Sequence, residues 1–181
     1  MRIMLWGCVM AMIFGCATRI PEEAASLLVD HVDLERYAGL WYQVGRYPHS
    51  FQRRPCGDST AEYAIRENGS ISVLNRCWEE EYGGAYTQQV KATARPVNES
   101  GSWLRVKFFG IFPAGYLIIE LDQEHYQWAA VTTPDRKSLW ILSRTSSLEP
   151  DVYDMIVASL EKKGFDPDLI IKTSQQPHAG M

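Results

Sequence analysis

The chain has 181 residues, of which 46% are hydrophobic and 22% are charged, and its formal net charge is −4 at pH 7. This composition is typical of a single globular domain, and it excludes a disordered chain, a coiled coil and a multi-pass membrane protein. The acidic balance also argues against nucleic acid as the main partner, because phosphate binding needs a basic face.

A short apolar segment at the N-terminus predicts an export signal. Arg2 is followed by uncharged residues over positions 3–14, a length that suits the core of a signal peptide and is too short to cross a bilayer. The segment ends in the pair Gly15-Cys16, and with the aliphatic residue before it this pair resembles a bacterial lipobox. An ordinary secretory signal that contains a cysteine is the alternative.

The lipobox resemblance implies a lipid-anchored protein. Cleavage after Gly15 would leave Cys16 at the new N-terminus, with a diacylglycerol on its thiol and an acyl chain on its amine. Several acyl chains on one residue give stable anchoring, whereas a single chain does not. Ala17 follows in place of aspartate, and by resemblance to enterobacterial lipoproteins this favours the outer membrane, with the domain at its periplasmic face.

Eight short segments with β-strand character follow, each closed by a turn signal. In the clearest of them Leu104, Val106 and Phe108 alternate with Arg105 and Lys107, so that apolar and charged side chains lie on opposite faces. The predicted strands span residues 41–47, 59–66, 70–77, 86–95, 103–109, 116–122, 126–132 and 138–144.

The connections between these strands are short and contain no helix, so neighbouring strands must be antiparallel. Eight such strands in sequence order predict an all-β fold, an eight-stranded antiparallel up-and-down barrel, which leaves no free sheet edge. A sandwich of two sheets is the alternative, because periodicity does not distinguish the two. The connection from Pro48 to Asp58 is long enough to be a lid or a binding loop.

One helix is predicted after the strands. Pro150 suits the first helical position and Gly164 suits the position just after the end of a helix. Val152, Ile156 and Leu160 recur every four residues, with Met155 beside them, and form one apolar stripe. Such a stripe predicts a C-terminal α-helix packed against the outside of the barrel.

Three motifs, in this order and spacing, resemble the sequence signatures of the lipocalin family. The resemblance extends over residues 31–176 and is greatest to the group that contains bacterial lipocalins and apolipoprotein D. The Gly-x-Trp motif alone is a weak signal, and all three motifs in register beside a lipobox are a strong one. The motifs are Gly39-Leu40-Trp41-Tyr42, Leu121-Asp122 through Tyr126, and Leu139-Trp140-Ile141-Leu142-Ser143-Arg144.

The resemblance implies a division of the chain into four parts. Residues 1–15 are expected to be a lipoprotein signal peptide, residues 16–30 the lipidated N-terminus and a tether, residues 31–176 the barrel with its helix, and residues 177–181 a tail. It also implies that Gly39, Trp41 and Arg144 close one end of the barrel, with the guanidinium over the indole as a cation–π contact.

Four residues are candidates for the wall of a ligand site. If Arg144 faces inward, Trp140 and Leu142 share its side of the strand, and Tyr63 lies on the apolar face of the second strand. Tyr116 is a candidate for a hydroxyl near a head group. Ordinary core packing is the alternative for each of them. The resemblance implies fatty acids or lysophospholipids as ligands.

Two cysteines remain once the signal and the lipid site are set aside. Cys56 and Cys77 are expected to form a disulfide, because an exported protein meets an oxidising environment and related lipocalins carry such a bridge. If Asn68-Gly69 is a two-residue hairpin turn, Cys56 lies opposite Glu81. The bridge would then require Cys56 to fold back from its loop toward Cys77.

The sequence therefore predicts a lipid-anchored binding protein that stores or transports lipids, and not an enzyme. The alternatives are a lipid isomerase with a free cavity cysteine, Cys56, and an envelope scaffold that binds no ligand. No cofactor or metal is expected, because the four histidines show no ligand spacing. Exposed aromatic residues such as Phe109 or Phe112 are candidates for a homodimer or a membrane contact.

Overall fold

A computed structural model describes residues 20–48, 58–78, 86–173 and 175. Four sequence predictions therefore fall outside the described residues: the signal peptide at 1–15, the lipid site at Cys16, the role of Cys56 and the tail at 177–181. The same holds for most of the long connection from Pro48 to Asp58 and for the side chain of Phe112.

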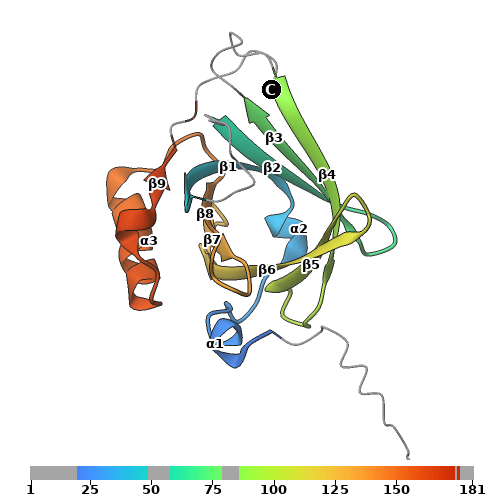
Figure 1. Cartoon of the computed structure of the whole chain (residues 1–181), viewed down its shortest axis with the longest axis horizontal. Coiled ribbons are helices and arrows are strands. Elements are labelled where there is room, and N and C mark those ends of the chain that lie inside the picture. Colours follow the sequence, from blue (N-terminus) through green and yellow to red (C-terminus); the bar gives the residue numbers. More distant parts are fainter. Residues whose placement is uncertain (1–19, 49–57, 79–85, 174, 176–181) are drawn as a thin grey trace, which may run out of the picture.

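The strands form one closed barrel (Figure 1). Each strand pairs with its sequence neighbours in antiparallel fashion, and β1 pairs with both β2 and β8, which closes the sheet. The predicted eight-stranded up-and-down barrel is therefore confirmed and the sandwich is excluded. The strands are β1 (Gly39–Arg46), β2 (Asp58–Ile65), β3 (Ile71–Trp78), β4 (Tyr86–Pro96), β5 (Trp103–Phe108), β6 (Phe112–Leu121), β7 (Trp128–Thr132) and β8 (Leu139–Ser143).

A ninth strand that the sequence did not indicate, β9 (Ile171–Lys172), pairs with the second half of β1. β1 pairs with β2 only from Gly39 to Tyr42. The later residues of β1 pair with β9 on that side. Lys172 lies opposite Gly45, so β9 supplies the ladder partner that β2 no longer provides. Two residues carry too little periodicity to be recognised from sequence.

The hairpin between β2 and β3 has a register one residue different from the expected one. Its loop has three residues and not two, since the Arg66 amide donates to the Ser70 carbonyl and the Gly69 amide donates to the Arg66 carbonyl. Gly69 has φ 72°, which fits a turn followed by a bulge. Cys77 lies opposite Ser59 as a result, so the assumed two-residue turn was wrong. Cys56 and Glu81 themselves lie outside the described residues.

The C-terminal helix α3 (Pro150–Lys162) packs on the outside of the barrel, as predicted (Figure 1). Ile156 and Leu160 are fully buried, in a cluster that includes Val44 and Ile141 from the outer face of β1 and β8. The apolar stripe differs from the prediction in one member. Met155 is half exposed, and Tyr153 is buried in the cluster.

Two short helices precede the barrel. They are α1 (Glu22–Ala25) and α2 (Leu34–Tyr37), and a 3₁₀ turn (Pro167–Leu169) precedes β9. Ala24 and Leu27 are buried in the outer cluster, so the described part of the expected tether is packed against the barrel. Among the residues described, we find no helix with the length and apolarity that a membrane crossing requires.

Candidate functional site

One end of the barrel is closed by an aromatic and a cationic side chain that the sequence predicted to lie together. Trp41 comes from the start of β1 and is fully buried, and Arg144 follows the end of β8. The guanidinium carbon of Arg144 lies 3.8 Å from the centre of the Trp41 ring. The indole Nε1 donates a hydrogen bond of 2.8 Å to the carbonyl of Tyr37 in α2. The closed end of the barrel is therefore a packed layer.

Backbone carbonyls satisfy the Arg144 guanidinium. Its Nη1 donates to the Leu40 carbonyl at 2.8 Å, and its Nη2 donates to the Ala38 carbonyl at 2.9 Å. Its Nε donates to the carbonyl of Tyr126 in the β6–β7 connection. Partial burial lowers the pKa of Arg144 from its ordinary value, but an arginine remains charged. The charge joins α2, β1 and the β6–β7 connection, so its role is structural.

Gly39 belongs to this closed end because of its backbone. Its φ is 98°, in a region that residues with a side chain rarely adopt. A Cβ atom at this position would lie 3.2 Å from Nη1 of Arg144. A side chain would therefore crowd the guanidinium that covers Trp41.

The four candidate ligand residues all lie on the inner wall of the barrel. Tyr63 and Leu142 are buried in the interior cluster that contains Trp41, and Tyr116 and Trp140 are partly buried against the same cluster. The structure thus brings together the residues that the sequence proposed.

Three tyrosine hydroxyls meet inside this apolar wall. The hydroxyl of Tyr116 lies 2.8 Å from that of Tyr37, and the Tyr63 hydroxyl donates to Tyr116 at 3.0 Å. Two hydrogen bonds use two of the three hydroxyl protons. The third proton, on Tyr37 or Tyr116, has no acceptor within the part of the chain that the structure describes. The cluster therefore offers one hydrogen-bond donor to a molecule inside the barrel.

Burial controls the ionisation of this tyrosine cluster. Desolvation raises the pKa of Tyr63 to about 12, although its hydrogen bond to Tyr116 acts in the opposite direction. Desolvation likewise raises the pKa values of Tyr37 and Tyr116 well above their ordinary value. All three hydroxyls are neutral at physiological pH, so they act as donors and acceptors and not as anions.

Sequence reasoning missed Tyr37. It lies in α2, before the first predicted strand, and no motif or strand alternation marked it. The short helix brings its ring to 5.0 Å from the Trp41 ring and 5.6 Å from the Tyr63 ring, measured between centroids. Asp33 caps this helix by accepting a hydrogen bond from the Arg36 amide, and this capping aspartate, four residues before Tyr37, was the available signal.

A second group of polar residues lies further along the inner wall of β1. Gln43 is paired with Leu142 and shares its inward face, and it is buried, but its side-chain Nε2 has no hydrogen-bond partner among the described residues. Arg46 is opposite Trp140 in the same ladder. The Gln175 side chain donates to the backbone carbonyls of Gln43 and Ser59. These polar groups were also missed, because β1 carries a bulge between Gln43 and Gly45 that breaks simple alternation.

Cys77 is buried on β3, and its register position opposite Ser59 places it at the inner wall. Its expected partner, Cys56, lies outside the described residues, so the predicted bridge remains a prediction. Within the described ranges no three His, Cys, Asp or Glu side chains gather as metal ligands. The described interior can therefore bind by desolvation and by hydrogen bonds from tyrosine and glutamine.

Comparison with known proteins gives consistent results. The family model of the lipocalin-like domain matches residues 32–175. The chain is 40% identical over 163 residues to the outer membrane lipoprotein Blc of Vibrio cholerae, covering 90% of this chain and 92% of that protein. It is 34% identical to the outer membrane lipoprotein Blc of Escherichia coli K12, with 91% and 90% covered.

More distant similarities point the same way. Mouse apolipoprotein D is 31% identical over 153 residues, covering 81% of this chain and 78% of that protein. Among solved structures, apocrustacyanin C1 superposes with a TM-score of 0.66 at 19% sequence identity, covering 87% of this chain and 88% of that one. Similarity at that identity supports the fold alone.

Proposed function

This chain belongs to the lipocalin family, and from that premise we propose that it binds a single-chain lipid, a fatty acid or a lysophospholipid, inside its barrel. Lipocalins bind small hydrophobic ligands, and an eight-stranded barrel has room for one of them. The lipid class is the part of the proposal that needs experiment.

The observation that carries the proposal is an apolar inner wall that contains unpaired polar donors. Inward positions on neighbouring strands are aliphatic or aromatic, as in the row formed by Val73, Ala92 and Phe108. Each methylene of an acyl chain that leaves water contributes roughly 0.8 kcal/mol. The driving force for binding would therefore be desolvation of the chain.

Hydrogen-bond donors supply the polar part of the site. One proton of the Tyr37–Tyr63–Tyr116 cluster and Nε2 of Gln43 lack protein acceptors among the described residues. A buried donor without a partner costs about 1–3 kcal/mol. A carboxylate, ester or phosphate oxygen of a lipid would relieve that cost, whereas a hydrocarbon would not.

We also propose that the protein is anchored at the outer membrane. Two relatives that are 34–40% identical are named outer membrane lipoproteins, and Gly15-Cys16 resembles a lipobox. The expected anchor is the acylated Cys16, with the barrel at the periplasmic face. Metabolic labelling with radioactive palmitate should label the wild-type chain and leave Cys16→Ser unlabelled. Labelled Cys16→Ser would exclude this anchor.

The ligand proposal can be tested by titration. The purified protein is delipidated and titrated with a lysophospholipid while tryptophan fluorescence is followed, because Trp41 and Trp140 lie in or against the interior cluster. We expect saturation in the micromolar range, since the methylene contribution is offset by the cost of association. No change at high micromolar lipid would contradict the proposal.

Two neighbouring residues of β4 provide matched variants. Ala92 is buried on the inner wall, whereas Thr93 lies on the outer face. Ala92→Phe should fold and lose lysophospholipid binding, and Thr93→Phe should retain it. If Ala92→Phe instead fails to fold, the interior is already filled by side chains, and the scaffold alternative is supported over lipid binding.

A further inference from the structure

The outer surface of β4 and β5 carries a row of cations. Lys91 and Arg95 on β4, and Arg105 and Lys107 on β5, occupy the outward positions of the two strands, and neither strand contains an aspartate or a glutamate. Arg95 lies directly opposite Arg105 in the ladder. Like charges in directly opposed positions destabilise a sheet. We call these four residues the cationic face.

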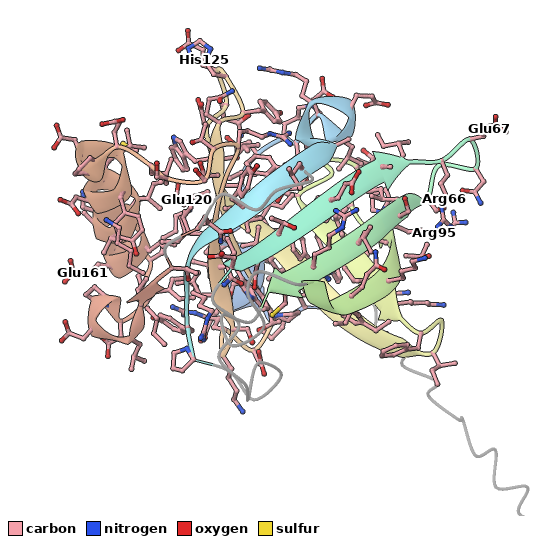
Figure 2. All side chains as sticks on the ribbon, turned by 90° about the horizontal axis from the view of Figure 1, so that it is seen from above. Arg66, Glu67, Arg95, Glu120, His125 and Glu161 are labelled. Carbon is pink, nitrogen blue, oxygen red and sulfur yellow. The ribbon has the colours of Figure 1, made fainter. Side chains whose placement is uncertain are left out.

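The sign of this surface is opposite to that of the whole chain. The formal net charge is −4, yet the two strands together contribute four cations and no anion. Figure 2 shows Arg95 on the side of the barrel away from α3. A cationic area on an acidic protein is suited to an anionic partner, since attraction acts within a Debye length of about 10 Å.

An exposed apolar turn lies next to the cationic face, directly after Lys107 and Phe108 of β5. Phe109 and Ile111 connect β5 to β6, and the exposed fractions of their side chains are 73% and 70%. These residues precede the first residue of β6, whereas the β6–β7 connection, after the last residue of β6, contacts Arg144. The tip is therefore at the opposite end of the barrel from Trp41 and Arg144. We call Phe109 to Ile111 the apolar tip.

The backbone of the apolar tip makes its aromatic residue unexpected. Phe109 and Gly110 have φ values of 51° and 75°, and the Ile111 amide donates to the Phe108 carbonyl. This is the hairpin turn in which asparagine is the preferred first residue. A bulky residue with positive φ is strained. Phe109 therefore occupies a position that neither burial nor turn geometry favours.

We infer that the apolar tip and the cationic face dock the end of the barrel opposite Trp41 onto an anionic phospholipid bilayer. Phe109 and Ile111 would enter the acyl region, and Lys107 and Lys91 would meet phosphate groups. Apolar side chains flanked by cations bind membrane surfaces in this way. The inference goes beyond ligand binding, because a barrel with an empty interior would dock equally well.

The depth of Ile111 in a bilayer tests this inference. The full chain carrying Ile111→Cys, with Cys8→Ser and Cys16→Ser so that position 111 is the labelled thiol, is spin-labelled without reductant. It is then mixed with vesicles of phosphatidylethanolamine and phosphatidylglycerol in a three-to-one ratio. Floated vesicles are then measured for collision of the label with oxygen and with a water-soluble nickel complex. Glu124→Cys is the control, because Glu124 is exposed on the β6–β7 connection at the closed end.

We expect the Ile111 label to contact oxygen and the Glu124 label to contact the nickel complex. In phosphatidylcholine vesicles the inserted fraction at Ile111 should fall several-fold. Lys91→Gln with Lys107→Gln should lower it about fivefold for each lost cation. Arg66→Gln with Lys162→Gln removes the same charge elsewhere and should have little effect.

Three results would overturn the inference. The first is an Ile111 label that remains in water on the anionic vesicles, and the second is a chain that does not float with them. The third is spin–spin broadening at Ile111 that grows with protein concentration in the absence of lipid, which would identify the apolar tip as a contact between two copies of the chain. Saturable lysophospholipid binding in the titration described above is unaffected by any of these results.

Discussion

The hydroxyl of Tyr37, from the helix that precedes the barrel, lies 2.8 Å from the hydroxyl of Tyr116 on β6. Tyr63 on β2 donates to the same Tyr116 oxygen. Tyr116 is thus the centre of a hydrogen-bonded group that joins three elements far apart in the chain. The group lies in apolar surroundings, where a polar contact is strong and an unpaired polar atom is costly.

Phenylalanine substitutions in this group should have unequal effects on stability. Tyr116→Phe leaves the hydroxyls of both Tyr37 and Tyr63 without their partner, and we expect the free energy of unfolding to fall by about 2–3 kcal/mol. Tyr63→Phe keeps the bond between Tyr37 and Tyr116 and should cost about 1 kcal/mol. Urea unfolding at neutral pH measures both. Equal losses would contradict the central position of Tyr116.

The same group predicts a loss of stability in alkali. Folding raises the pKa of Tyr63 to about 12, whereas an unfolded tyrosine titrates near 10. The folded state therefore holds its protons more tightly, so the stabilisation is complete below pH 10 and is lost as pH rises toward 12. Each tyrosine that stays protonated only in the folded state should lower the free energy of unfolding by about 1.4 kcal/mol per pH unit in this window.

Tyr63→Phe provides the control for that titration. Urea midpoints between pH 8 and pH 12 should show a shallower decline for the variant than for the wild type. Tyrosinate absorbance should rise for the buried tyrosines only when the protein unfolds. A wild-type stability curve that is flat through this window would exclude the raised pKa values.

Removing Arg144 should destabilise the closed end of the barrel. Arg144→Ala removes the contact with Trp41 and leaves the carbonyls of Leu40 and Ala38 without their donor. We expect a loss of about 3 kcal/mol. Arg144→Lys keeps the charge but not the planar group, so it should recover only part of the loss.

Urea denaturation and the tryptophan emission, to which Trp41 contributes, report on this change. Exposure of the indole should shift the emission to the red in Arg144→Ala. The exposed Arg66 gives the comparison, and Arg66→Ala should change stability by no more than about 0.5 kcal/mol. A loss in Arg144→Ala as small as this would show that the guanidinium is dispensable.

The predicted bridge between Cys56 and Cys77 can be counted directly. Mature protein unfolded without reductant should contain no free thiol, because Cys16 is expected to be acylated. Reduction should release two thiols and lower the free energy of unfolding by about 3 kcal/mol. A reactive thiol before reduction would contradict the bridge and support the isomerase alternative, for which a free cysteine is required.

Local sequence patterns determined the eight antiparallel strands and the helix, whereas the closure of the strands into a barrel and not a sandwich was shown by the pairing of β1 with both β2 and β8. Alternation of apolar and polar residues, as in Leu104 through Phe108, is a property of each strand by itself, and short connections require antiparallel neighbours. The stripe of Ile156 and Leu160 likewise predicted which face of α3 is buried. The family motifs added the contact between Trp41 and Arg144, because the resemblance places both residues at one end.

The tertiary structure decided the features that depend on contacts between distant segments. Tyr37 joins Tyr63 and Tyr116 only because α2 lies across the end of the barrel, and no pattern within four helical residues encodes that position. The orphaned amide of Gln43 arises from a bulge in β1, and the pairing of β9 arises where β2 leaves that strand. Burial, pairing and polar satisfaction are properties of the whole packed molecule, so they follow from the closed barrel and not from the period of any one segment.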